Sequence, residues 1–272
     1  MALTPTGEIV DAAAKAGRGV GAFNVIQLEH AEALVAGAEA AGAPVVVQIS
    51  ENAVRYHGSL APIGLATLAV ARQSSTRVAV HLDHAESADL VDEAVALGFT
   101  SVMFDASKLD YEENVRATAE VVRRCHAAGV HVEAELGEVG GKDGVHAPGA
   151  RTDPDRAREF VEATGVDALA VAVGSSHAML TRDAVLDFEL IGLLRDKVGV
   201  PLVLHGSSGV PDDGLRRAVA NGIVKVNIGT QLNKVFTAAV REHEAVDPRK
   251  YLGPAREAVA AEVARLLTVL GL

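Results

Sequence analysis

The sequence predicts an α/β fold built as a single (β/α)8 barrel over residues 1–272, with a helix at its C-terminal end. Three observations predict it. Eight short apolar or β-branched runs, each ending in polar residues or glycine, are typical of strands covered on both faces. Stretches with helical spacing separate these runs, and such alternation favours parallel βαβ units. The length of 272 residues suits one large domain of this kind.

The predicted elements follow one another along the whole chain. The strands are expected at 21–25, 44–50, 77–84, 101–107, 131–136, 168–176, 201–209 and 223–230. Helices are expected at 29–41, 87–97, 112–128, 155–164, 211–221 and, at the C-terminus, 254–270. Glycine follows several helical stretches at once, as expected for a helix end: Gly42, Gly98, Gly129, Gly165 and Gly222. A doubly wound open sheet is the alternative, but eight strands in this length leave no second domain.

The longest irregular stretch, residues 137–154, follows the fifth predicted strand. It is rich in glycine, which is typical of a mobile loop able to close over a bound substrate.

Composition excludes several functional classes. A formal net charge of −11 argues against a nucleic-acid-binding protein, which needs a basic face, although a local site can still bind an anion. The one cysteine, Cys125, excludes an intramolecular disulfide. The N-terminal stretch lacks the apolar core of a signal peptide, and no segment approaches the roughly 18 apolar residues of a membrane span. We therefore expect a cytoplasmic protein that acts on neither nucleic acid nor membranes.

Titratable side chains gather where the predicted strands end, which is where catalytic groups lie in such barrels. The third strand ends with residues 81–84 (HLDH), the fifth carries Glu133 and Glu135, and histidines close the sixth and seventh as His177 and His205. A lone histidine at a strand end is more often a hydrogen-bonded scaffold residue. Three on different strands around one mouth instead predict a zinc site with an open position, although no local His-x-His or Cys-x-x-Cys pair supports it.

The loops after the seventh and eighth strands are small and rich in glycine and hydroxyl groups. They read GSSG at 206–209 and Gly229-Thr230. Barrels of this type frequently bind phosphate there, through exposed backbone N–H groups. The same glycines also suit plain tight turns; beside a metal cluster, the phosphate interpretation is favoured.

Several segments together resemble the signature motifs of class II fructose-bisphosphate aldolases. They are residues 81–84 (HLDH), 132–137 (VEAELG), 204–209 (LHGSSG), 225–228 (KVNI) and 247–252 (DPRKYL), and the similarity begins with 21–25 (GAFNV). The similarity covers essentially the whole chain, and its short length resembles the branch that includes tagatose-bisphosphate aldolases.

The resemblance implies a metal site and an acid–base group. It implies His84, His177 and His205 as zinc ligands, with Glu135 near an alternative position of the metal. Zinc would polarise the oxygens of dihydroxyacetone phosphate and stabilise the enediolate. Asp83 matches the family's proton donor to the aldehyde oxygen. His81 either orients Asp83 or is a plain core histidine.

The resemblance also implies the residues that hold the substrate. Asn227 matches the residue that binds the enediolate oxygen. Ser208 and Thr230, with the backbone at Ala178 and Gly206, correspond to the phosphate pocket, near which a monovalent cation is a further expectation. Ser50 matches a residue that lines the substrate channel.

The sequence departs from the family pattern at two places. The family usually has a glutamate in the loop after its Gly-Gly pair, whereas Lys142 and Asp143 follow that pair here. We expect Asp143 to replace this glutamate, which moves the proton at C3 of the ketose; otherwise the loop has lost a residue. Ala178 also stands where the family commonly has glycine, so a Cβ could crowd the phosphate.

The predicted function is reversible cleavage of a ketose 1,6-bisphosphate, fructose 1,6-bisphosphate first, into dihydroxyacetone phosphate and glyceraldehyde 3-phosphate. The same chemistry on tagatose 1,6-bisphosphate or another phosphorylated ketose is the alternative. Rivals are a non-catalytic sugar-phosphate-binding barrel and a metal-free lysine-imine aldolase. Lys108 and Lys225, on or just beyond predicted strands, are the candidate imine-forming lysines. Neither is well supported: Lys225 precedes an expected cavity residue by two positions, and Lys108 has no obvious carboxylate partner. We expect a homodimer or homotetramer, with the helix at 254–270 as a candidate interface.

Overall fold

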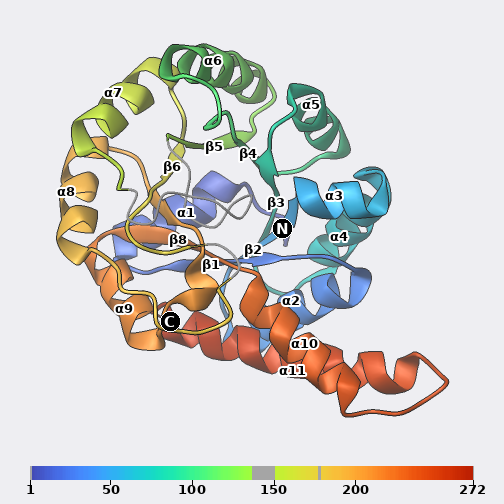
Figure 1. The fold of residues 1–272 in the computed structure, drawn as a ribbon. Coiled ribbons are helices and arrows are strands. Elements are labelled where there is room, and N and C mark those ends of the chain that lie inside the picture. The colour runs from blue at the N-terminus through green and yellow to red at the C-terminus, as the bar shows by residue number, and fades with distance from the viewer. Residues whose placement is uncertain (1, 137–150, 177–178, 272) are drawn as a thin grey trace.

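Eight parallel strands close into a barrel in the order β1-β2-β3-β4-β5-β6-β7-β8, with helices around it (Figure 1). This computed structural model describes residues 2–136, 151–176 and 179–271. The strands are β1 (Val20–Asn24), β2 (Val45–Ser50), β3 (Val78–Ala85), β4 (Ser101–Phe104), β5 (His131–Glu135), β6 (Ala168–Ala170), β7 (Leu202–Leu204) and β8 (Ile223–Ile228). The predicted TIM-barrel fold is therefore confirmed.

Helices precede and follow the strands, and most of them surround the barrel (Figure 1). They are α1 (Thr6–Ala16), α2 (Leu28–Ala41), α3 (Glu51–His57), α4 (Ala61–Gln73), α5 (Ala88–Leu97), α6 (Tyr111–Ala127), α7 (Pro154–Thr164), α8 (Phe188–Val198), α9 (Asp212–Asn221), α10 (Thr230–Arg241) and α11 (Arg249–Val269), with a 3-10 turn, η2 (Ser207–Gly209). The five glycines predicted to end helices all have positive φ, as expected.

Helix α1 closes the N-terminal end of the barrel. Its Ile9, Val10 and Ala13 are buried against interior side chains that include Val20 and Val46. An apolar plug at this end leaves the opposite, C-terminal end as the open mouth. The sequence reasoning did not predict this helix.

Several strands end earlier than predicted, and the difference is largest for β6 and β7. In β7, Gly206 adopts a left-handed conformation with φ 65° and turns the chain into η2, so the strand ends at Leu204 rather than at 209. Strand β6 pairs with β5 only to Glu135 and with β7 only to Val203, so it ends at Ala170 rather than at 176. Because its neighbours end there, the rest of the predicted strand continues as irregular chain towards the mouth.

Helix α11 begins at Arg249, five residues before the predicted start, and Pro254 lies inside it. It packs against α2 and α10, and the α10–α11 connection extends beyond the barrel wall at the lower right of Figure 1. Among the described residues, no helix is both long and apolar enough to cross a membrane.

Candidate active site

A cavity of about 290 Å³ opens at the C-terminal end of the barrel, and its wall contains most of the predicted site residues. Residues at the ends of β1, β2, β3 and β8, in the loops that follow the strands and in the first turns of α3 and α10 line it: Asn24, Val25, Ile26, Gln48, Ser50, Asn52, Asp83, His84, Gly206, Ser208, Asn227, Gly229, Thr230 and Asn233. Most of the predicted site residues therefore gather at the end of the barrel where this cavity opens.

A β-bulge at the end of β3 turns two consecutive side chains into this cavity. Opposite β4, Leu82 pairs with Val102 and Ala85 pairs with Phe104, so β3 has one residue more than its partner over this stretch. In a regular strand, neighbours point to opposite faces. An extra residue breaks this alternation, and Asp83 and His84 both line the cavity. His84 has φ 52°, the one positive value outside glycine among the described residues, a strained conformation that is common at functional sites.

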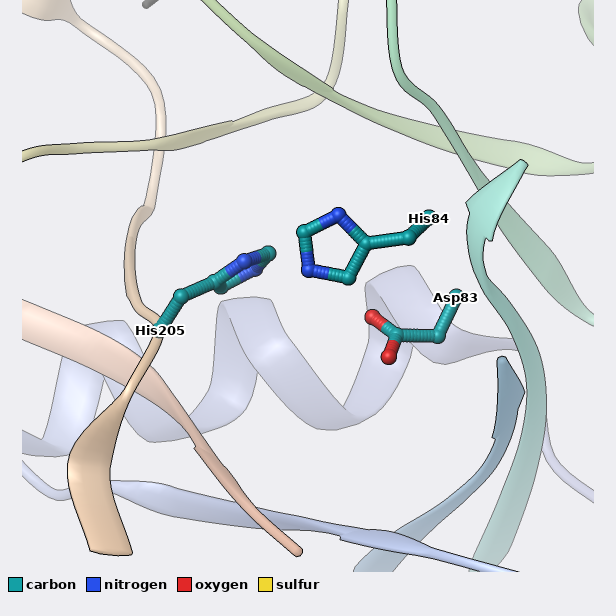
Figure 2. Close-up of side chains that lie close together, drawn as sticks. All are labelled: Asp83, His84 and His205. Atoms are coloured by element: carbon teal, nitrogen blue, oxygen red, sulfur yellow. The ribbon is translucent and has the colours of Figure 1, made fainter. Parts of the chain in front are cut away.

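The cavity holds a cluster of groups able to bind a metal ion. Asp83, His84 and His205 each offer a ligand atom, and these atoms lie within 4.8 Å of one another (Figure 2). The two imidazole rings are 4.7 Å apart between centroids and nearly perpendicular. A second group of the same kind joins His84 to Asp105 and Glu135.

Buried carboxylates fix the orientation of both histidines. His84 Nδ1 lies 2.9 Å from Asp105 Oδ2, and His205 Nε2 lies 2.9 Å from Glu133 Oε1. An ionised carboxylate only accepts hydrogen bonds, so each of these ring nitrogens carries a hydrogen. Nδ1 of His205 then keeps the lone pair that a metal needs, and Nε2 of His84 offers one once its proton has left. Carboxylate-held imidazoles of this kind are typical of metal-binding histidines, so the donor set fits a divalent metal ion.

The charges around the cluster shift the pKa values in a consistent pattern. Burial alone would lower the pKa of His84, but Asp83, Asp105 and Glu135 outweigh it and raise the pKa to about 9. Burial lowers the pKa of His205, so its imidazole is neutral. Burial would raise the pKa of Asp83, yet the nearby positive charges prevail and lower it. Asp83 is therefore an ionised carboxylate, which can accept a proton.

Two amides hold the Asp83 carboxylate in place. Asn227 Nδ2 donates to Oδ1 at 3.3 Å, and Asn24 Nδ2 donates to Oδ2 at 3.4 Å. Gln48 Nε2 in turn donates to Asn24 Oδ1 at 3.2 Å. Side chains of β1, β2 and β8 thus hold Asp83, which is only 3% exposed, at the floor of the cavity.

The predicted phosphate loops lie along the β7 and β8 side of the same cavity. A Cβ at Gly206 would come within 2.5 Å of the Ser176 backbone, so glycine is required where these two chain segments meet. Ser208 Oγ accepts a hydrogen bond from the backbone N–H of Gln231, in the first turn of α10. Thr230 begins that helix, and a helix N-terminus favours anions. Across the cavity, Ser50 caps α3 by accepting from the N–H of Ala53.

Three predicted site residues, His177, Ala178 and Asp143, lie outside the described residues, as does most of the predicted loop at 137–154. The structure brings the other predicted site residues together at the mouth of the barrel. Glu135 is buried, and its Oε2 lies 3.8 Å from His205 Nδ1.

The structure favours one of the two roles considered for His81 and corrects the prediction for Lys108. His81 Nδ1 is hydrogen-bonded to Ser101 Oγ at 2.7 Å, and its pKa is lowered to about 3 by burial and by Lys225. This neutral, buried imidazole fits the core role. Lys108 was predicted to have no obvious carboxylate partner, which is wrong: its Nζ lies 3.3 Å from Glu86 Oε1.

Sequence reasoning also missed Asp105 and Lys225 as members of the site. Asp105 directly follows β4, and a carboxylate at a strand end was the available signal. Lys225 is buried inside the barrel on β8 and is bonded to Glu133 and Asn227. From the sequence, Lys225 was considered only as a possible imine-forming lysine.

Known proteins share both the sequence and this architecture. The family described as "Fructose-bisphosphate aldolase class-II" matches residues 4–272. The chain is 42% identical to a fructose-bisphosphate aldolase of Geobacillus stearothermophilus, over 97% of this chain and 95% of that protein. It is 41% identical to a probable fructose-bisphosphate aldolase of Bacillus subtilis, with the same coverage.

Solved structures agree. The YdjI aldolase from Escherichia coli K12 superposes with a TM-score of 0.90 at 34% identity, covering 99% of this chain and 97% of that one. A putative fructose-1,6-bisphosphate aldolase from Coccidioides immitis gives a TM-score of 0.86 at 30% identity, covering 98% and 97%. The chain therefore belongs to the class II fructose-bisphosphate aldolase family and is an aldolase, a lyase that cleaves carbon–carbon bonds.

Proposed function

We propose that this aldolase reversibly cleaves fructose 1,6-bisphosphate to dihydroxyacetone phosphate and glyceraldehyde 3-phosphate, with zinc as its metal. The observation that carries the proposal is the placement of two carboxylate-held histidines beside Asp83, where Asp83 and His84 line the cavity and His205 is buried next to them. The names of the bacterial relatives support fructose 1,6-bisphosphate as the substrate. The loops after β7 and β8, which line the cavity, suit the phosphate group of such a sugar.

Class II aldolases are metal-dependent, and His84 and His205 are the described residues that fit a metal. We propose His177 as the third ligand, since it directly follows Ser176, which lies against Gly206. Three imidazoles are a common catalytic zinc set. Glu135 is proposed to serve an alternative metal position, because it belongs to the second cluster with His84 and Asp105. When bound, the metal supplies Lewis-acid stabilisation of developing negative charge on the substrate oxygens.

Asp83 and Asn227 have separate proposed roles in the reaction. Asp83 is ionised, is held by two amides and lines the cavity. In cleavage it therefore accepts the proton of the C4 hydroxyl group, beside the carbon–carbon bond that breaks. In condensation it returns that proton to the aldehyde oxygen. Asn227 has an amide N–H group beside Asp83, suited to an enediolate oxygen.

Binding of the substrate phosphate is assigned to Gly206, Ser208 and Thr230, with the backbone of Ala178 beside them. A monovalent cation near this pocket would help to balance the phosphate charge. Ser50 is proposed to line the substrate channel on the opposite wall of the cavity.

Asp143 is proposed as the base that moves the proton at C3 of the ketose. Asp143→Ala should strongly slow exchange of the dihydroxyacetone phosphate proton with solvent, measured by NMR without aldehyde. Phosphate affinity should change little, because it depends on other residues. Asp143→Glu is the matched control and should retain or raise the rate. Wild-type exchange in Asp143→Ala would move the search to Glu138.

A comparison of ketose bisphosphates tests the substrate. We expect the value of kcat/KM to be higher for fructose 1,6-bisphosphate than for tagatose 1,6-bisphosphate, which differs only at C4. The measurement is steady-state cleavage with coupled detection of the triose phosphates. A preference for tagatose 1,6-bisphosphate would support the proposed cleavage reaction but would contradict the proposed substrate. No cleavage of any phosphorylated ketose by metal-loaded protein would favour a non-catalytic sugar-phosphate-binding barrel.

A homodimer or homotetramer is proposed as the assembly, in the cytoplasm. The helix at 254–270, which forms most of α11, is the proposed interface. Sedimentation or light scattering of the purified protein would measure the assembly.

A further inference from the structure

We propose that Lys225 is a positioning residue that sets the orientation of the Asn227 amide and so presents its N–H group to the reacting oxygen. This inference rests on the proposed role of Asn227 in the cleavage reaction. It concerns a side chain that the reaction steps above do not use.

Lys225 is a charged side chain inside the barrel, only 1% exposed. Its Nζ donates to Glu133 Oε2 at 2.8 Å and to Asn227 Oδ1 at 2.9 Å. Lys225 is absent from the cavity wall, whereas Asn227 is part of it. The ammonium group therefore lies one layer below the reacting groups and acts on the site through Asn227.

The chemistry of the two neighbours leaves one orientation for the amide. A lysine ammonium group has donors only, and an ionised carboxylate has acceptors only. The amide oxygen of Asn227 must face Lys225, and its NH₂ group must face Asp83, as the distances of 2.9 and 3.3 Å indicate. The lysine thus anchors the oxygen end of an amide whose nitrogen end lies at the cavity, so that the donor is directed there before substrate arrives.

Glu133 connects this arrangement to the metal-binding side. Its Oε2 accepts from Lys225, and its Oε1 accepts from His205 Nε2 at 2.9 Å. Removing Lys225 alone would leave a buried carboxylate without its cation, which is strongly destabilising. The test therefore neutralises Glu133 in every protein; glutamine keeps an oxygen that can accept from His205. In the reference protein, Lys225 keeps Asn227 Oδ1 as its acceptor and the nearby Asp83 as a counter-charge.

The test is a double-mutant cycle in a Glu133→Gln background. The four proteins carry Glu133→Gln alone, or together with Lys225→Met, with Asn227→Ala, or with both. With Asn227 present, Lys225→Met should lower kcat about 10- to 100-fold, because the donor is misplaced; its complete loss would cost about 100- to 1,000-fold. KM should change little. With Asn227 replaced by alanine, Lys225→Met should change kcat less than about twofold, because the amide through which it acts is gone.

Three further measurements accompany the cycle. Metal content should stay equal in all four proteins. Met103→Leu, at another buried strand position, is a volume-conserving control and should keep wild-type kcat. In metal-free ¹⁵N-labelled protein, the Asn227 side-chain NH₂ signals, assigned by their loss in Asn227→Ala, should exchange with solvent faster after Lys225→Met. If Glu133→Gln itself loses metal, the same cycle is run with Glu133 intact.

A purely structural role of Lys225 predicts the same loss of kcat with and without Asn227, and unchanged exchange of the amide protons; either result would overturn the inference. These outcomes differ from failure of the proposed function. If wild-type enzyme cleaves no ketose bisphosphate, the proposed function is wrong. If it cleaves normally and the two losses are additive, only the role of Lys225 is wrong.

Discussion

Asp83→Ala should lower the turnover number by about two to four orders of magnitude, the usual loss when a general acid–base group is removed. Metal should remain near one equivalent, because His84 and His205 are held by Asp105 and Glu133, which the substitution leaves in place. Steady-state cleavage and metal analysis of the same samples measure both quantities.

Asp83→Asn is the matched control for shape, because it keeps the size of the side chain but cannot take up the proton. It should be nearly as inactive as the alanine variant. Asp83 also lies within 4.8 Å of the histidine ligand atoms, so direct coordination is the competing role. Loss of metal from both variants would favour that role, and full activity of Asp83→Ala would make the acid–base assignment wrong.

Metal removal should abolish cleavage, and zinc or cobalt should restore it. His205→Ala should lose the metal, since its imidazole is fully buried in the cluster with Asp83 and His84 and its removal takes away a ligand. Chelation should also be easier in acid. Without metal, the pKa of His84 is about 9, so below that pH a proton occupies the imidazole. Metal must displace this proton, and its apparent affinity should fall about tenfold per pH unit below about 9.

His126→Ala serves as the control for a lost histidine. This side chain lies on α6, exposed and paired with Asp167, so its loss should leave metal content and activity unchanged. Activity that persists in metal-free protein and disappears after borohydride treatment with substrate would contradict the zinc proposal. It would indicate a lysine imine instead.

Much of the fold could be predicted because strand and helix patterns are local. Val45–Ser50 was recognised almost to the residue, since a β-branched run buried on both faces is distinctive. Helix α1 was missed because its partners are the ends of distant strands rather than its neighbours in sequence. The overlong predictions for β6 and β7 have a similar origin: where a strand ends depends on where its partners end.

The site was predicted by residue type at strand ends, which identified Asp83, His84, His205 and Asn227. Patterns alone could not reveal which carboxylate holds which histidine. Asp105 and Glu133 do so from other strands, and such pairings depend on barrel register. The resemblance to a known family supplied roles for residues that composition leaves ambiguous.

The extra residue in β3 has a consequence for anyone who wishes to transplant this chemistry. In a regular strand without the extra residue at this point, side chains would alternate, and Asp83 and His84 would point to opposite sides of the barrel wall. Every other residue of the cavity could remain. A graft that copies only side-chain identities onto an ordinary strand should therefore bind the metal or supply the acid, but not both. The backbone irregularity has to be transferred with the residues it presents.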